Sequence, residues 1–338
     1  MMNANEHVKV MQDGVERLRT LYPEMRPANI YFTVGVFRSG GTVTDGMVLI
    51  GSEISLADSS AVTDELPEHL GHLSEFFATD PARNLAFVNV HELIHTQQAG
   101  RWGYDLLSQC LHEGIAEFIP TLAMGRPSPA ASVLYGEANT DRVRAVFEDE
   151  LFAYWIDRWI WNDTNGPFPV RDMGYYVGYA MAQRYYEQAA HKQQAIADLI
   201  GLNCEDSAAV NDFAERTRWL TRPIADLRAS FEAARPRITH IAEFDNGSTR
   251  VDPGTKTITL YFDRAMSTAY RSTGAGPSAD AAYPQVSNVH FSEDGRSVVY
   301  EVSLTPGTHY QMMLEEGYRD ERSFQMVPYT VDFNTLHQ

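Results

Sequence analysis

Hydrophobic residues recur at helical spacing in the first two thirds of the chain. Residues 6–21 place apolar side chains three or four positions apart, which predicts an amphipathic helix. The β-rich runs Asn29–Phe37 and Gly46–Ile54 flank a Gly-rich segment at 38–46, and they predict two strands around a turn. Further helical patterns cover 81–99, 103–119, 141–161, 173–191 and 207–233.

The pattern changes after Arg235. Short β-rich runs alternate with turns from there to the end of the chain, which is typical of a β-sandwich of about 100 residues. Alternate residues in two of these runs would form one buried sheet face: Ile258, Leu260, Phe262, Val298, Tyr300 and Val302. We therefore predict an α+β chain of two domains. A mostly helical domain with a small N-terminal sheet would span 1–235, and a β-sandwich domain would span 236–338.

Charge and composition exclude several classes of function. The 338 residues carry a formal net charge of -18 and no Lys/Arg cluster, so nucleic acid and anionic membranes are poor partners. The longest apolar run is shorter than 18 residues, which argues against a membrane span, and the N-terminus lacks the apolar core of a signal peptide. The two cysteines, Cys110 and Cys204, exclude a disulfide framework but leave one bridge open.

The segment "HELIH" at 91–95 carries the strongest chemical signal. Side chains four residues apart share a helix face, so His91 and His95 can reach one zinc ion at about 2.0–2.1 Å. Glu92 lies about 100° around the helix, from where its carboxylate can approach a water on the metal. Asp80 is the predicted N-cap of this helix, Pro81 suits its first turn, and Gly100 suits its exit.

A catalytic zinc needs a third protein ligand, and the next predicted helix supplies a candidate. Glu113 follows His95 by 18 positions, and a second packed helix would return its carboxylate to the metal. Gly114 would allow a close approach of the two helix backbones, and Glu117, one turn after Glu113, is placed to accept the free N–H of a ligand histidine. His112 remains an alternative ligand, and an ordinary solvated face is the alternative for both acids.

These motifs resemble the gluzincin metallopeptidases, in which H-E-x-x-H is followed by a glutamate on the next helix. "HELIH" with "HEGIAEF" fits that pattern over about residues 29–190. The resemblance implies zinc on His91, His95 and Glu113, Glu92 as general base, and Glu117 as the partner of His91. The G-x-M-E-N segment by which the aminopeptidase branch binds a free amine is missing here, so the resemblance does not extend to aminopeptidase activity.

The same resemblance points to an oxyanion-stabilising tyrosine. The segment "YYVG" at 175–178 looks like the tyrosine-containing segment that does this in the aminopeptidase branch, which implies Tyr175, with Tyr176 and Tyr179 as alternates. A phenol can donate to a developing oxyanion. The alternative is that these tyrosines are packing residues of a helix.

The segments "VDPGTKTITLYFDRAM", "SEDGRSVVYEV", "LTPGTHYQMML" and "PYTVDFNT" resemble the bacterial Ig-like domains first described in surface-layer proteins. The match covers nearly all of 236–338. It implies a spacer or a module that contacts a surface partner, and an extracytoplasmic location (periplasmic, cell-surface or secreted).

Two functions from different classes follow. The first is a zinc-dependent peptidase, whose peptide or protein substrate would pair with an exposed strand such as Met47–Ile54. The second is a non-catalytic surface binding protein with a structural metal site. An open fourth position on zinc favours the first, and a fourth protein ligand would favour the second.

Overall fold

The structure is a computed structural model that describes residues 4–337 apart from 45, 101, 102, 104, 155 and 163–165, and it does not describe the side chains of 4–7. Arg101 and Trp102, between the two predicted metal-site helices, and Tyr104, within the predicted helix 103–119, thus lie outside the described residues. Helices and strands both contribute, and the chain is of the α+β class. No helix in the described ranges combines the length and the apolar character needed to cross a bilayer.

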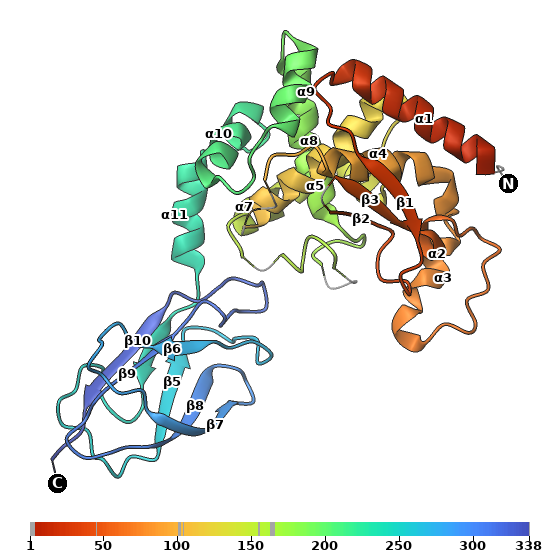
Figure 1. The fold of residues 1–338 in the computed structure, drawn as a ribbon. Coiled ribbons are helices and arrows are strands. Elements are labelled where there is room, and N and C mark those ends of the chain that lie inside the picture. Colours follow the sequence, from red (N-terminus) through yellow and green to blue (C-terminus); the bar gives the residue numbers. More distant parts are fainter. Residues whose placement is uncertain are drawn as a thin grey trace. The chain divides into compact units, whose positions relative to one another are not determined.

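The helices and strands follow one another along the chain in this order: α1 (Ala4–Leu21), β1 (Asn29–Thr33), β2 (Gly41–Thr44), β3 (Met47–Gly51), α2 (Ser52–Ser55), the 3₁₀-helix η1 (Glu68–Leu70), α3 (His72–Phe77), the 3₁₀-helix η2 (Pro81–Asn84), α4 (Leu85–His95), α5 (Leu106–Met124), α6 (Ala131–Ala138), α7 (Thr140–Glu150), α8 (Met173–Gln188), α9 (Lys192–Ile200), α10 (Ser207–Thr217), α11 (Ile224–Ala234), β4 (Ile238–Ile241), β5 (Thr257–Phe262), β6 (Thr273–Ala275), β7 (Gln285–Phe291), β8 (Ser297–Ser303), β9 (His309–Leu314) and β10 (Tyr329–Asn334) (Figure 1).

The chain divides into two compact units. The first comprises Met1–Glu148 and Trp159–Ile224, and the second comprises Asp149–Arg158 and Ala225–Gln338. The second unit therefore takes in nearly all of α11 and a ten-residue segment from the middle of the chain, whereas the change in sequence pattern placed a single boundary at Arg235.

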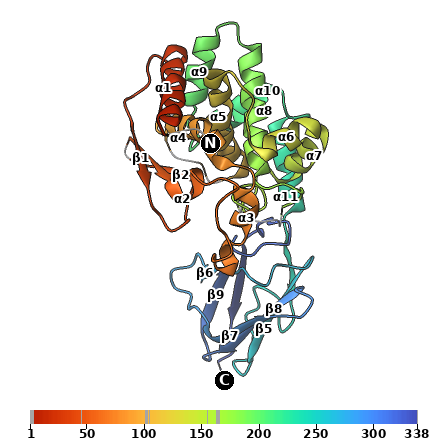
Figure 2. The same ribbon diagram turned by 90° about the vertical axis from the view of Figure 1, so that its right-hand side faces the viewer.

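The first unit has a three-stranded sheet on one flank of its helices, beside α4 (Figures 1 and 2). The strand order is β1-β3-β2, with β3 parallel to β1 and antiparallel to β2. Strand β2 lies in the segment predicted to be only a turn. Since β3 has a partner on each side, the prediction that Met47–Ile54 offers a free edge to a peptide is wrong. Among the described strands, the sheet edge that lies against α4 belongs to β2.

The α-helix observed here is shorter than the helix that the sequence pattern predicts over 81–99. A 3₁₀ turn occupies Pro81–Asn84, and α4 ends at His95, five residues before Gly100. The cap prediction for Asp80 is wrong, because this residue has a φ of 54° and its carboxylate accepts the backbone N–H of Ser59 at 2.9 Å instead. Pro81 does stand in the first turn, as expected for a residue without an N–H to satisfy.

Helix α5 packs against α8 at a pair of glycines. A Cβ at Gly114 would overlap the backbone of Gly178 and Tyr179, and a Cβ at Gly178 would overlap the carbonyl of Cys110. The predicted close backbone approach at Gly114 therefore exists, but the partner is α8 and not the metal helix α4. Cys110 and Cys204 are both buried and free.

Two other helices are shorter than their sequence patterns predict, one because of tertiary packing and one because of a proline. Helix α7 ends at Glu150 and not at 161, because the aromatic residues that follow are drawn into different cores: Phe152 packs on Phe231 and Trp159 packs on Phe147. The pattern at 207–233 splits into α10 and α11 around Pro223, which has no N–H to donate and cannot continue a helix.

The second unit contains two antiparallel sheets of order β4-β5-β8-β7 and β10-β9-β6, which share one hydrophobic core. The six residues predicted to form one sheet face are all buried in that core. Strands β5 and β8 pair so that Ile258 lies opposite Tyr300 and Leu260 opposite Val298. The short strand β6 was not predicted.

The ten-residue segment 149–158 is tied to the same unit by charge and by aromatic packing. Asp157 accepts from Arg319 at 3.1 Å, Gln325 donates to the carbonyl of Phe152 at 3.2 Å, and the guanidinium of Arg228 in α11 lies 3.9 Å from the Phe152 ring centre. These contacts explain why this part of the chain belongs with the β-sandwich.

The α5–α8 contact makes Gly178→Ala strongly destabilising. The added methyl group meets a backbone carbonyl that cannot move alone, so we expect the free energy of unfolding to fall by about 3 kcal/mol or more in chemical denaturation. Gly14→Ala is the matched control, since its nearest obstacle is the flexible Met124 side chain at 2.7 Å and helix propensity offsets the crowding. Equal effects of the two substitutions would contradict this account of the contact.

Candidate metal centre

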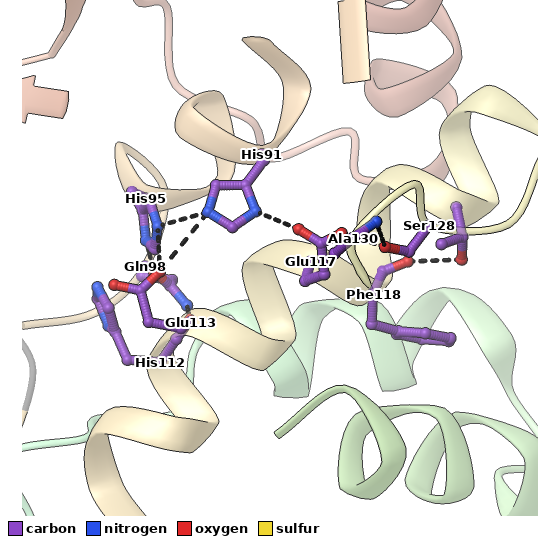
Figure 3. A network of polar contacts seen from close by, with 10 residues as sticks. His91, His95, Gln98, His112, Glu113, Glu117, Phe118, Ser128 and Ala130 are labelled. Carbon is purple, nitrogen blue, oxygen red and sulfur yellow. Dashed lines mark hydrogen bonds and ion pairs between the residues drawn. The ribbon is translucent and has the colours of Figure 1, made fainter. Parts of the chain in front are cut away.

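Helices α4 and α5 bring three predicted ligands to one point (Figure 3). The Nε2 atoms of His91 and His95 are 3.1 Å apart, and Glu113 Oε2 lies 3.6 Å from the first and 3.3 Å from the second. Within the described ranges this is the only group of three or more His, Cys, Asp or Glu side chains whose ligand atoms converge in this way. His112, the alternative ligand, is not part of the group.

The spacing of these donor atoms fits a tetrahedral ion. Ligands at about 2.0–2.1 Å from zinc lie about 3.3–3.4 Å from one another along the edges of a tetrahedron. The three observed separations of 3.1, 3.3 and 3.6 Å bracket that value. Two imidazoles and one carboxylate also match the donor chemistry of catalytic zinc sites with three protein ligands. The residues therefore fit a zinc ion.

Glu117 forms a hydrogen bond with the ring nitrogen of His91 that points away from the other two predicted ligands. Its Oε2 lies 2.9 Å from His91 Nδ1, and its Oε1 accepts the hydroxyl of Ser128, which itself accepts the backbone N–H of Ala130 at 3.0 Å (Figure 3). An ionised carboxylate has no proton to donate, so it accepts a hydrogen bond from His91 Nδ1–H. The other ring nitrogen, Nε2, is then the one that faces the metal position. The role of Ser128 was not predicted, because it depends on the chain returning to α5 after Gly125.

Gln98 is the corresponding partner of the second histidine, and its role was not predicted. Its Oε1 lies 2.7 Å from His95 Nδ1, and its Nε2 donates to the carbonyl of His112 at 2.7 Å (Figure 3). The only available signal was its position three residues after His95. The His112 ring stacks on the His95 ring, with centroids 4.7 Å apart, and so contributes packing to the site.

The buried carboxylates of this cluster favour a positive charge beside them. Burial lowers the pKa of His91, but hydrogen bonds to Glu113 and Glu117 outweigh it and raise that pKa to about 10. Burial alone would raise the pKa of Glu113, yet the neighbouring His95 and His91 hold it well below its usual value. Carboxylates this deeply buried need a cation beside them, which either a proton or a metal ion supplies.

Glu92 faces the sheet side of the site. Its side chain packs against the edge strand β2 so closely that a Cβ at Gly41 would come within 2.8 Å of the Glu92 Cγ atom. Glycine at position 41 therefore makes room for this carboxylate. Burial raises the pKa of Glu92, and the charges of His91 and His95 partly oppose the shift.

Of the three candidate tyrosines, only Tyr175 reaches the histidines. Its ring lies roughly parallel to that of His91, with centroids 6.0 Å apart, and burial raises the pKa of its hydroxyl well above the usual value. Tyr176 instead contacts the Thr140 hydroxyl at 2.6 Å, and Tyr179 packs on Phe118. The structure thus places Tyr175 beside the metal-site histidines and places the two alternates in helix packing.

Comparison with known proteins adds little to this geometry. No family model and no curated protein matches the chain. Among solved structures, domains 1–6 of surface-layer protein SbsC match with 13% identity and a TM-score of 0.22, over 97% of this chain and 45% of that one. The N-terminal part of the same bacterial S-layer protein matches with 12% identity and a TM-score of 0.22, over 98% of this chain and 79% of that one. The chain thus spans less than half the length of the first of these structures.

Ser128→Ala tests the hydrogen bond behind Glu117. Removing a donor to a buried carboxylate is expected to lower the free energy of unfolding by about 1–3 kcal/mol, measured by chemical denaturation. Ser132→Ala replaces a comparably buried serine on α6, outside this network, and should change stability by less than about 1 kcal/mol. If the two variants were equally stable, Ser128 would have no special role in holding Glu117.

Proposed function

We propose that the chain is a zinc-dependent peptidase of the gluzincin type. The observation that carries the proposal is the convergence of His91, His95 and Glu113 on one point, at separations that suit a tetrahedral ion. Three donors leave one position of a tetrahedral ion for solvent, which is the arrangement of catalytic rather than structural zinc. The positions of Glu92 and Tyr175 beside the same cluster add the general base and the hydrogen-bond donor that peptide hydrolysis requires.

His91, His95 and Glu113 would hold the zinc ion, with Glu117 and Gln98 fixing the imidazoles. Zinc, when bound, supplies a Lewis acid and lowers the pKa of a water to about 7. Glu92 would accept a proton from the attacking water and return it to the leaving amine. Tyr175 would donate a hydrogen bond to the carbonyl oxygen as negative charge develops there.

The edge of β2 offers a place for an extended substrate. This strand pairs with β3 on one side, and its residue Gly41 adjoins Glu92, so a peptide hydrogen-bonded along β2 would pass beside the proposed base. In this proposal the β-sandwich unit is a spacer or a contact module, and the protein acts outside the cytoplasm. Both of these points rest on the resemblance of residues 236–338 to bacterial Ig-like domains.

Loss of the third ligand should abolish tight zinc binding. We expect the wild-type protein to retain one zinc per chain after dialysis and Glu113→Ala to retain almost none, measured by metal analysis and by competition with a chromophoric chelator. Glu148→Ala removes another buried acid, one that accepts from Thr221, and should keep its zinc. Full zinc occupancy in Glu113→Ala would remove this residue from the ligand set.

Loss of the base should separate metal binding from catalysis. Glu92→Gln keeps the size of the side chain but cannot accept a proton, so we expect zinc content to be unchanged and hydrolysis of a quenched-fluorescent peptide library to fall by about 10²–10⁴-fold. Glu75→Gln, on α3, is the control and should turn over at the wild-type rate. Hydrolysis by Glu92→Gln at the wild-type rate would exclude Glu92 as the base, and a zinc-loaded wild type that cleaves no peptide would refute the peptidase.

A further inference from the structure

Gln98 lies just beyond the end of α4, with only 6% of its surface exposed, and both ends of its amide are used. One end faces His95 Nδ1 at 2.7 Å and the other faces the carbonyl oxygen of His112 at 2.7 Å (Figure 3). The side chain therefore connects a metal-site histidine of α4 to the backbone of α5, one residue before Glu113.

The chemistry of the two partners fixes the direction of the amide. A backbone carbonyl can only accept, so the NH₂ group of Gln98 must face His112 and the amide oxygen must face the imidazole. An amide oxygen can only accept, so His95 must carry its proton on Nδ1. The other ring nitrogen, Nε2, faces the place where His91 and Glu113 also converge.

The two histidines thus have partners of different charge. Glu117 beside His91 is a carboxylate, whereas Gln98 beside His95 is neutral. Glu92, Glu113 and Glu117 already bring three acidic groups into one buried region, and a fourth would add repulsion and a further cost of desolvation. A glutamine supplies the same acceptor without charge, and it supplies a donor that a carboxylate does not have.

We propose that Gln98 is a positioning residue of the metal centre, which fixes the Nδ1–H tautomer of His95 and ties that histidine to the backbone that carries Glu113. The inference rests on the proposed function insofar as the cluster must bind zinc. If Gln98 has this role, His95 of α4 and Glu113 of α5 are held near each other before the ion binds. Less conformational entropy is then lost on binding.

The neighbouring Gln97 is a matched control. It has the same exposed fraction of 6%, and its amide also makes two backbone contacts, accepting from Arg26 N at 2.7 Å and donating to Arg26 O at 3.2 Å. Neither contact involves a ligand of the metal site. Replacing either glutamine with methionine keeps the length of the side chain and removes its hydrogen bonds.

The test compares Gln98→Met and Gln97→Met in the full chain. We expect Gln98→Met to bind zinc about 10–100-fold more weakly in chelator competition and to alter the visible absorption spectrum of the cobalt-substituted protein. Gln97→Met should match the wild type in both measurements, while both variants melt at a lower temperature than the wild type when metal-free. Wild-type zinc affinity together with an unchanged cobalt spectrum in Gln98→Met would overturn the proposal.

The other outcomes separate this proposal from the peptidase. A wild type that binds zinc but cleaves no peptide would refute the peptidase alone, and the loss of zinc affinity in Gln98→Met would still support the role of Gln98. A wild type that binds no zinc would refute both. If Gln98→Met does not fold, imidazole ¹⁵N NMR of the zinc-loaded wild type decides: a slowly exchanging Nδ1–H on His95 supports the proposal, and a rapidly exchanging one overturns it.

Discussion

The packing of α5 between α4 and α8 is the constraint on which the rest of the first unit depends. Successive residues of a helix differ in direction by about 100°, so the helix that turns Gly114 toward α8 turns Glu113 and Glu117 toward α4. Without a glycine at both 114 and 178, α5 and α8 could not approach so closely, and the carboxylates of α5 would be displaced from the histidines. A steric contact on one face of the helix thus sets the polar geometry on a neighbouring face.

The polar cluster is stable in this setting because nearly every member has an assigned partner. His91 has Glu117, His95 has Gln98, and Glu117 also has Ser128. A buried ionic group without partners would destabilise the fold, whereas a connected network keeps each side chain in one orientation. The donors that remain, two imidazole nitrogens and one carboxylate oxygen, all face the same point.

The second unit is stabilised by hydrophobic packing and not by a buried polar network. Its stability comes from a hydrophobic core between two sheets, with alternate residues of β5 and β8 on one buried face. The segment 149–158 and α11 join this unit through an ion pair to Asp157 and through the packing of Phe152 and Phe231. A unit of the fold is therefore assembled from two separate stretches of the chain, because side-chain contacts and not chain continuity define it.

The sequence by itself determined the features that depend on local spacing. Two histidines four apart share a helix face, two acids four apart share another, and alternation with period two makes one face of β5 and β8 buried. Only the tertiary structure decided what depends on neighbours distant in sequence: that Gly114 meets α8, that β2 is the strand beside Glu92, that Tyr175 and not Tyr176 lies by His91, and that Gln98 connects two helices. Spacing specifies the direction of a side chain on its own element, whereas its partner depends on how the elements pack, which no local pattern encodes.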